Sequence, residues 1–182
     1  MRAIIFMLLI LGLVYFILLQ YNKLMEKKNA MEKAWKVINT ELIKCNKYIS
    51  ELLVYVKGLF EKSWINRVQE MNNFLVIGKP YSRLNMNINF ELIIEKIYEV
   101  IEKHPEYAKD KKLINLKAEL ISSQNKIKHG VVQYSQAVAD YLKLRGEFPT
   151  KYVGDLLGFE KFDDIKIEND HLQAMKKEVN SA

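Results

Sequence analysis

Three histidines and one cysteine are the side chains in this sequence most able to bind a metal ion or attack a substrate: His104, His129, His171 and Cys45. The histidines lie far apart, in three different predicted elements. A di-iron site in a helical bundle requires two Glu-x-x-His pairs, and the sequence does not contain two. Zinc motifs, glycine-rich phosphate loops and nucleophile elbows are also missing. The sequence therefore predicts no catalytic, metal-binding or cofactor-binding residues, and a protein that is not an enzyme.

Charge and cysteine content exclude further classes of function. The net charge is +6, but the basic residues are interspersed with acids and form no recognisable binding motif, so nucleic acid is not a predicted partner. A single cysteine cannot form an internal disulfide. Cys45 falls on an apolar stripe, where a thiol is predicted to be a small buried hydrophobe.

An apolar block at the start of the chain is long enough to cross a membrane. Residues Ala3 to Leu19 contain no charged side chain, and a helix of this length extends about 25 Å, at the short end of what crosses a bilayer core. Its Leu, Ile, Phe and Val residues favour insertion by about 4 to 8 kcal/mol in total. A cleaved signal peptide is the alternative, but no small-residue cleavage site follows the block. We expect an uncleaved transmembrane anchor in contact with the lipid bilayer.

Positive charge follows this block closely, whereas only Arg2 and the amino terminus precede it. The positive-inside rule then places the amino terminus outside the cell and the larger part in the cytoplasm. The lysines concerned are Lys23, Lys27, Lys28, Lys33 and Lys36. They could contact anionic lipid headgroups. The alternative is ordinary solvated lysines interspersed with Glu26 and Glu32.

Past Tyr21 the apolar residues form a stripe whose spacings, after a first gap of seven, alternate between four and three. Its members are Leu24, Met31, Trp35, Ile38, Leu42, Cys45, Ile49, Leu52, Val56 and Leu59. This heptad period keeps one narrow face toward a partner helix. Lys28 falls on the stripe, and we expect the helix there to have left the membrane without yet meeting its partners. No proline occurs between Met1 and Ile77, so the anchor and the first bundle helix are predicted to form one element.

The middle of the chain predicts two shorter helices. A polar helix is expected from Glu61 to Asn73, followed by an apolar patch, Phe74 to Ile77, which with Trp64 is the best candidate for an exposed contact or a lid. Asn85, Asn87 and Asn89 predict a loop, with a helix cap at Asn89. Helical spacing then predicts an amphipathic helix from Phe90 to Lys103, which His104-Pro105 ends.

A second long helix is predicted from a cap at Asp110 to a stop at Gly146. Its stripe matches that of the first helix and consists of Leu113, Leu116, Leu120, Ile127, Val131, Tyr134, Val138 and Tyr141. Thr150 to Phe162 is predicted to be a short helix or turn that caps the bundle. No segment alternates with a period of two. The expected fold is all-α: an N-terminal transmembrane helix (1–20), continuous with an antiparallel bundle of about four long helices (21–162), and a polar, mobile tail (163–182).

Two ordered blocks of residues match a known family pattern. The first block is Tyr21-Asn22-Lys23-Leu24, then Ala34-Trp35, Ile38, Leu42, Ile49, Leu52 and Val56-Lys57-Gly58. The second is His104-Pro105-Glu106-Tyr107-Ala108-Lys109, Glu119-Leu120, Asn125-Lys126-Ile127, Tyr134, Val138, Tyr141, Phe148-Pro149, Gly158-Phe159 and Phe162. In this ordered set the chain resembles the LemA family of prokaryotic membrane proteins. The chain departs from the family pattern at Lys47 to Leu52, which lacks the usual proline and asparagine, and at Tyr134-Ser135 and Tyr141-Leu142, which lack the asparagine after tyrosine. The resemblance implies one anchor and long antiparallel helices, and it supplies no catalytic residues.

Two functions are compatible with these features. The first is a scaffold or adaptor that holds an unidentified protein partner at the cell membrane through its bundle. The second is a protein of envelope maintenance or remodelling that binds anionic lipid through Lys23 to Lys36. An enzyme with an unrecognised site is a further alternative.

Overall fold

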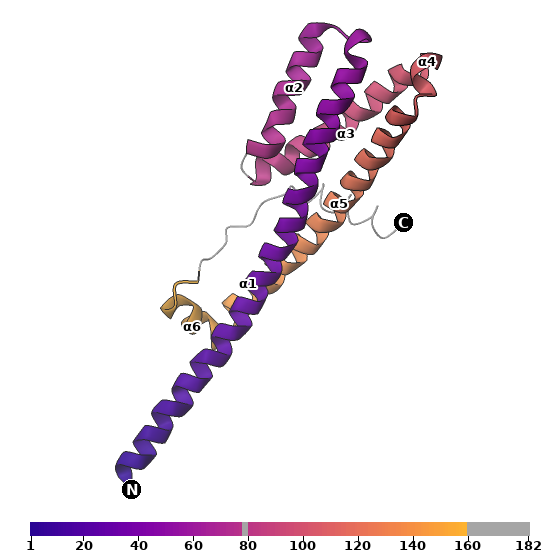
Figure 1. The fold of residues 1–182 in the computed structure, drawn as a ribbon. Coiled ribbons are helices and arrows are strands. Elements are labelled where there is room, and N and C mark those ends of the chain that lie inside the picture. Colours follow the sequence, from indigo (N-terminus) through magenta and orange to yellow (C-terminus); the bar gives the residue numbers. More distant parts are fainter. Residues whose placement is uncertain (78–79, 160–182) are drawn as a thin grey trace. The chain divides into compact units, whose positions relative to one another are not determined.

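The protein is described by a computed structural model over residues 1–77 and 80–159. Six α-helices and one short 3₁₀ helix follow one another along this part of the chain, which contains no strand, and the predicted all-α class is confirmed. The elements are α1 (Arg2–Tyr55), η1 (Val56–Gly58), α2 (Lys62–Ile77), α3 (Pro80–Glu102), α4 (Pro105–Ala108), α5 (Lys111–Gly146) and α6 (Thr150–Leu156). Figure 1 shows the fold. The predicted tail from 163, with Phe162 and His171, lies outside the described residues.

The chain divides into two compact units. The first, which we call the anchor unit, contains Met1–Trp35 and the described residues from Val132 to 159. The second, the bundle unit, contains Lys36–Val131. Helices α1 and α5 contribute to both units, whereas α2, α3 and α4 belong to the bundle unit and α6 to the anchor unit.

Helix α1 is continuous from Arg2 to Tyr55, so the predicted joining of the anchor to the first bundle helix is confirmed. Eight of the ten stripe residues are buried, and the other two, Trp35 and Leu59, are half-buried. The expectation that the helix has not met its partners near Lys28 is wrong, because Leu24 is already fully buried within the anchor unit. The heptad stripe therefore begins to pack within two turns of the end of the apolar block.

Helix α5 supplies the matching stripe, and all eight of its predicted members are buried. Asp110 caps the helix as predicted, because its Oδ1 accepts hydrogen bonds from the backbone N–H groups of Lys112 (2.7 Å) and Leu113 (3.3 Å). In the bundle unit α5 approaches α1 closely at Gly130, where an added Cβ would lie 2.8 Å from Cγ1 of Ile38. Glycine is needed there for contact between the helices.

The predicted loop at Asn85, Asn87 and Asn89 is wrong, as is the cap at Asn89. Helix α3 begins at Pro80, where the fixed φ of proline suits the first helical turn, and it runs through all three asparagines to Glu102. The reason is tertiary: the buried residues Leu84, Asn87, Phe90, Ile94, Ile97 and Ile101 follow one another at helical spacing. Burial of this face outweighs the weak helix propensity of asparagine.

Helices α2 and α3 complete the bundle unit. Helix α2 packs on α1, and α3 packs on α5 through an ion pair between Glu91 and Lys128 at 3.3 Å and a hydrogen bond from the Tyr98 hydroxyl to the carbonyl of Leu113. Helix α2 ends at Ile77, so the apolar patch forms the last turn of this helix. His104 is extended and ends α3 before Pro105, as predicted.

Candidate membrane-interface site

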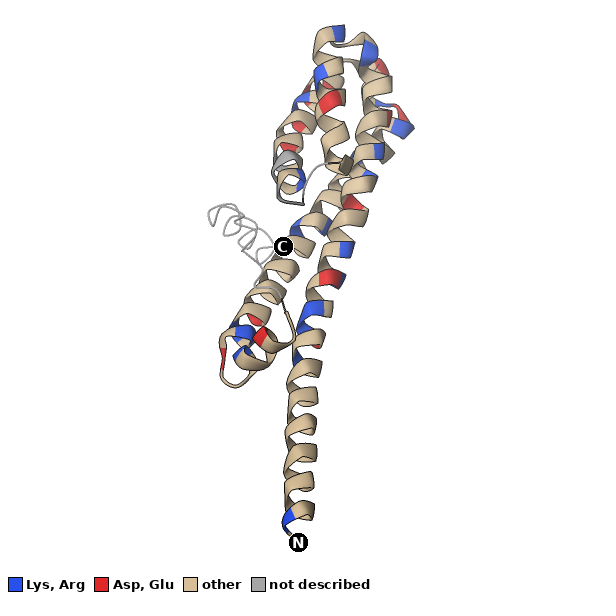
Figure 2. Ribbon diagram, turned by 90° about the vertical axis from the view of Figure 1, so that its left-hand side faces the viewer, with Lys and Arg blue, Asp and Glu red and all other residues tan. Residues whose placement is uncertain are grey.

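The apolar block of α1 has almost no protein cover. Between Ile4 and Leu19 the large apolar side chains are mostly 40% to 67% exposed, and α1 is the helix of the described chain that is long and apolar enough to cross a membrane. In the ribbon coloured by charge this end of α1 is uncharged beyond Arg2 (Figure 2). Such a surface requires an apolar environment, and the hydrocarbon core of a lipid bilayer would supply one.

The boundary of the block is marked by a buried polar contact. Gln20, the residue after Leu19, is buried, and its Oε1 accepts a hydrogen bond at 3.0 Å from the hydroxyl of Thr150 at the start of α6. One residue further along α1, the ring of Tyr21 makes an edge-to-face contact with Phe159, with centroids 5.7 Å apart. Both ends of the segment 150–159 are therefore held against neighbouring positions on α1.

Arg145, near the end of α5, holds α6 from the other side. Its guanidinium is 4% exposed overall and donates to a carboxylate oxygen of Asp155, to the carbonyl of Lys151 (2.9 Å) and to the carbonyl of Phe159 (3.4 Å). Gly154 lies against this side chain, and a Cβ there would come within 2.6 Å of the arginine Nε. The absence of a side chain at 154 thus allows Arg145 to reach its acceptors.

A shallow open pocket of about 290 Å³ lies beside these contacts in the anchor unit. Its lining residues are Tyr21, Met25, Lys28, Tyr141, Leu157, Gly158 and Phe159. The pocket explains how a charge is tolerated on the stripe, because Lys28 is half-buried at its edge and reaches Glu32 at 3.9 Å.

The five predicted lipid-facing lysines fall into two groups. Lys27 forms an ion pair with Asp140 of α5 at 3.3 Å, and Lys28 faces Glu32. Lys23, Lys33 and Lys36 are exposed and make no ion pair with another described residue. Hydrogen bonds from Gln136 and Lys27 lower the pKa of the Asp140 carboxyl. Three of the five lysines therefore remain available to headgroups.

The bundle unit also contains a polar interior, which sequence reasoning did not find. Asn72 of α2 is fully buried, and its Nδ2 donates to the carbonyl of Asn46 and to the hydroxyl of Ser50, each at 2.9 Å. Asn46 donates in return to the carbonyl of Asn72 at 2.8 Å. These bonds link α1 to α2. The sequence carried a signal for the burial of Asn72, since this residue lies four positions after Val68 and therefore on the same face of the helix.

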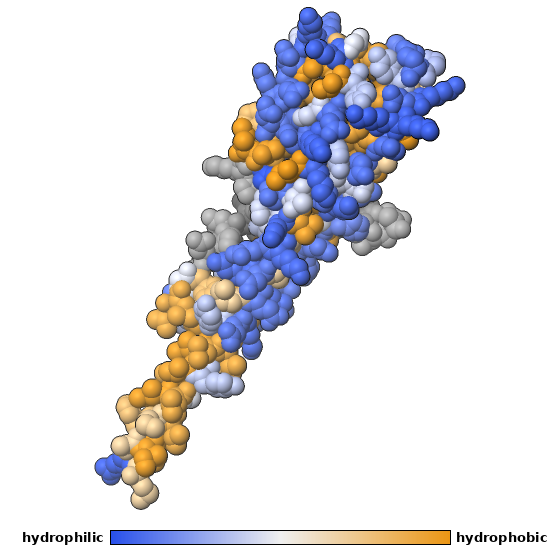
Figure 3. Space-filling model, in the orientation of Figure 1, coloured by the Kyte–Doolittle hydropathy of each residue, from blue (hydrophilic) through white to orange (hydrophobic). Residues whose placement is uncertain are grey.

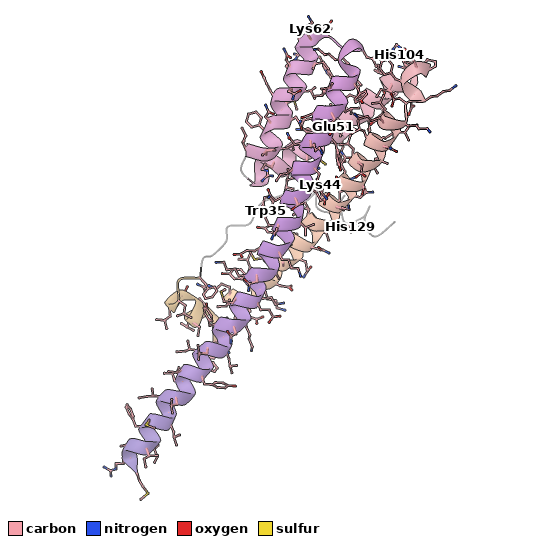
Figure 4. The ribbon with its side chains drawn as sticks, in the orientation of Figure 1. Trp35, Lys44, Glu51, Lys62, His104 and His129 are labelled. Atoms are coloured by element: carbon pink, nitrogen blue, oxygen red, sulfur yellow. The ribbon has the colours of Figure 1, made fainter. Side chains whose placement is uncertain are left out.

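Other candidate groups do not assemble into a site. Cys45 is buried, and desolvation raises the pKa of its thiol to about 12. His104 lies beside α4, where its Nδ1 is 3.5 Å from Glu106, whereas His129 is exposed on α5 away from it (Figure 4). Within residues 1–77 and 80–159, no three His, Cys, Asp or Glu side chains gather in a way that could hold a metal ion.

The end of α2 presents apolar side chains to solvent. Phe74, Val76 and Ile77 are exposed, with Ile77 at 76%, whereas Leu75 between them is fully buried. Hydrophobic residues gather at this end of α2 in the space-filling view (Figure 3). Trp64 is half-buried and stacks on Phe60 with centroids 4.3 Å apart. Of the two predicted contact surfaces, the patch from Phe74 to Ile77 is mostly exposed, whereas Trp64 is largely covered.

Comparison with known proteins places this architecture in a family. The sequence model of the LemA family matches residues 34–179, about four fifths of the chain, so the chain belongs to the LemA family. The match begins within α1, after the apolar block. No curated protein matches the chain.

Proposed function

We propose that this LemA family member is a single-pass protein of the cell membrane whose helical bundle acts as a scaffold or adaptor, without enzymatic activity of its own. The observation that carries the proposal is α1 itself. One helix without a break has a bare apolar block at its start and, from Leu24 on, a stripe buried by the helices around it. The element that inserts into lipid is thus the element on which the bundle is built.

The proposed orientation has the amino terminus outside and the bundle in the cytoplasm. Lys23, Lys33 and Lys36, which have no acidic partner among the described residues, support this orientation through the positive-inside rule. To test it, Asn73, exposed on α2, is replaced by cysteine in intact cells. A membrane-impermeant maleimide should label the variant only after lysis. Labelling in intact cells would reverse the orientation.

The exposed turn of α2 is the surface we propose for a protein partner. Phe74, Val76 and Ile77 expose apolar side chains on one short segment, a feature typical of contact surfaces. A photo-cross-linking amino acid at Ile77 should yield a reproducible adduct of defined mass in membranes, and Phe74→Ser should remove it. The matched control is Gln69, an exposed polar position on the same helix. Equal adducts from positions 69 and 77 would count against an adaptor surface at this end.

Binding of anionic lipid is the second candidate function, and the three unpaired lysines favour it. The chain is reconstituted in nanodiscs with equal amounts of anionic and zwitterionic lipid, and the lipid that remains with the solubilised protein is measured. A variant with Lys23, Lys33 and Lys36 replaced by glutamine should lose the enrichment of anionic lipid, as should high salt. Replacement of Lys57, Lys62 and Lys96, exposed lysines of the bundle unit, is the control. Loss in both variants would make the effect one of net charge alone.

A further inference from the structure

We infer that α6 is a second membrane contact: the segment from Phe148 to Leu157 lies in the lipid interface beside the anchor, with one apolar face toward the hydrocarbon. This inference rests on the proposed insertion of α1. It goes beyond that proposal, because it assigns a lipid-binding surface to a segment distant in sequence from the anchor.

An exposed apolar face is formed by Phe148, which precedes α6, and by Tyr152 and Leu156 of the helix. They are 83%, 66% and 71% exposed, respectively. Tyr152 and Leu156 are four residues apart and so lie on one side of the helix, and Phe148 joins them through an edge-to-face contact with Tyr152, with ring centroids 6.1 Å apart. Leu157 beside them is also exposed. Two large apolar side chains on one exposed face of a seven-residue helix, with Phe148 beside them, require an apolar environment.

The opposite side of α6 is fixed by the protein. Thr150, Val153 and Gly154 are buried, and Arg145 holds the carbonyl of Lys151 and the carboxylate of Asp155. These contacts prevent α6 from rotating to bury its apolar face against the anchor unit. The exposed face is therefore a property of the folded unit.

The level of α6 along α1 identifies lipid as the environment of its exposed apolar face. Thr150 is hydrogen-bonded to Gln20, and Phe159 contacts Tyr21, so both ends of the segment meet α1 within one residue of each other. Gln20 directly follows the last residue of the apolar block, Leu19. A helix held at this level must lie at the edge of the hydrocarbon if the block spans it. In Figure 3 the hydrophobic surface of the anchor continues into hydrophobic residues of α6 within the anchor unit.

The chemistry of the segment suits an interface. Tyrosine and phenylalanine are favoured at the headgroup level, where an amphipathic or aromatic ring meets both environments. Lys151 is exposed on α6, in a position to extend toward headgroups from a helix that lies flat. The buried Gln20–Thr150 bond satisfies the polar groups that would otherwise face hydrocarbon at this boundary. A contact of this kind would also supplement an anchor at the short end of the spanning range.

The test uses the full chain in liposomes of neutral phospholipid, with a nitroxide spin label attached to single introduced cysteines. Cys45 is buried, and mock-labelled unmodified protein gives the background. The three positions are Leu9 in the block, Leu156 on α6, and Ala139, an exposed residue of α5 in the same unit. The measurement is the ratio of collision rates with oxygen, which partitions into lipid, and with a water-soluble nickel complex.

We expect an oxygen-dominated ratio at Leu9 and Leu156 and a nickel-dominated ratio at Ala139. In a second variant, Tyr152→Lys together with the Leu156 label should shift Leu156 toward nickel while Leu9 stays unchanged. A nickel-dominated ratio at Leu156 with an oxygen-dominated ratio at Leu9 would overturn the inference and leave the anchor intact. Low accessibility of Leu156 to both reagents would mean that protein covers α6, and would also overturn it. A nickel-dominated ratio at Leu9 would overturn the insertion of α1 and, with it, this inference.

Discussion

The two units differ in how completely their buried polar side chains are hydrogen-bonded. In the anchor unit Gln20, Arg145 and Thr150 are buried, and each is hydrogen-bonded to another described residue. In the bundle unit Glu41 and Asn87 are buried as well, but each has a side-chain oxygen with no hydrogen-bond partner among the described residues. A buried polar group without a partner costs about 1 to 3 kcal/mol.

This difference shows what each set of polar groups does. The anchor unit uses hydrogen-bonded side chains to fix a short helix at one level of α1. The bundle unit obtains most of its stability from the apolar stripes, and its polar groups link helices at a smaller net gain.

Replacement of Arg145 by alanine should have the largest effect. It removes the bonds to Lys151, Asp155 and Phe159 at once. We expect α6 to lose about 3 kcal/mol of local stability, since hydrogen bonds to a buried charged group contribute more than neutral ones. The loss is not larger because Asp155 is half-exposed. Amide hydrogen exchange over 150–156 should then be about 100-fold faster, and Lys143→Ala, an exposed position on α5, should leave it unchanged. Equal exchange in both variants would show that Arg145 does not hold α6 in place.

Replacement of Asn72 by alanine should destabilise the bundle unit by about 2 kcal/mol. The change leaves the carbonyl of Asn46 and the hydroxyl of Ser50 without their donor. Thermal unfolding in detergent measures the loss. The neighbouring Asn73 is exposed, and Asn73→Ala should stay within about 0.5 kcal/mol of the unmodified chain. A neutral Asn72→Ala would show that this buried polar link contributes nothing.

The close approach of α5 to α1 predicts an unfavourable Gly130→Ala substitution. Alanine favours a helix by about 1 kcal/mol over glycine, but its Cβ would lie 2.8 Å from Cγ1 of Ile38, and such overpacking costs about 1 to 3 kcal/mol. We expect a net loss of about 1 kcal/mol. In a double-mutant cycle by denaturant unfolding, Ile38→Ala should cost less in the Gly130→Ala chain than alone. Additive costs would contradict a direct contact.

The smallest effect is expected at the ion pair between Lys27 and Asp140. Hydrogen bonds from Gln136 and Lys27 lower the pKa of Asp140, so their contribution is present above the ordinary aspartate pKa of about 3.9 and is lost as the pH falls through the lowered pKa. In an NMR titration of Asp140, both Gln136→Ala and Lys27→Ala should raise this pKa. Thermal unfolding at neutral pH should barely change, because the pair is on the surface. An unmoved pKa would show that neither bond persists in solution.

The stripes made most of the fold predictable from sequence. Leu24 to Val56 and Leu113 to Tyr141 are regular enough that their period alone gives two long helices and their buried faces. Asn85 to Asn89 misled the prediction, because local propensity favours a loop where tertiary burial of Leu84, Asn87 and Phe90 imposes a helix.

The interface site was less predictable, because its polar contacts join residues far apart in sequence. Gln20 and Thr150 are separated by 130 positions, and neither is unusual in its own neighbourhood. Arg145 did carry a signal, since it continues the spacing of Tyr134, Val138 and Tyr141 by four and so places a charge on the buried stripe. The end of α6 at Leu156 and the exposure of that residue could not be read from a pattern.

Hydrogen exchange of the full chain in nanodiscs would show whether the anchor and the bundle share one continuous helix in the membrane. The amides from Gln20 to Lys28 lie where a hinge would separate the two, and Lys23, Lys27 and Lys28 add sites for trypsin. We expect slow exchange throughout this segment, comparable with that of Met31 to Leu42, and no cleavage at the three lysines. Fast exchange or ready cleavage between Gln20 and Lys28 would show a hinge and contradict a continuous helix.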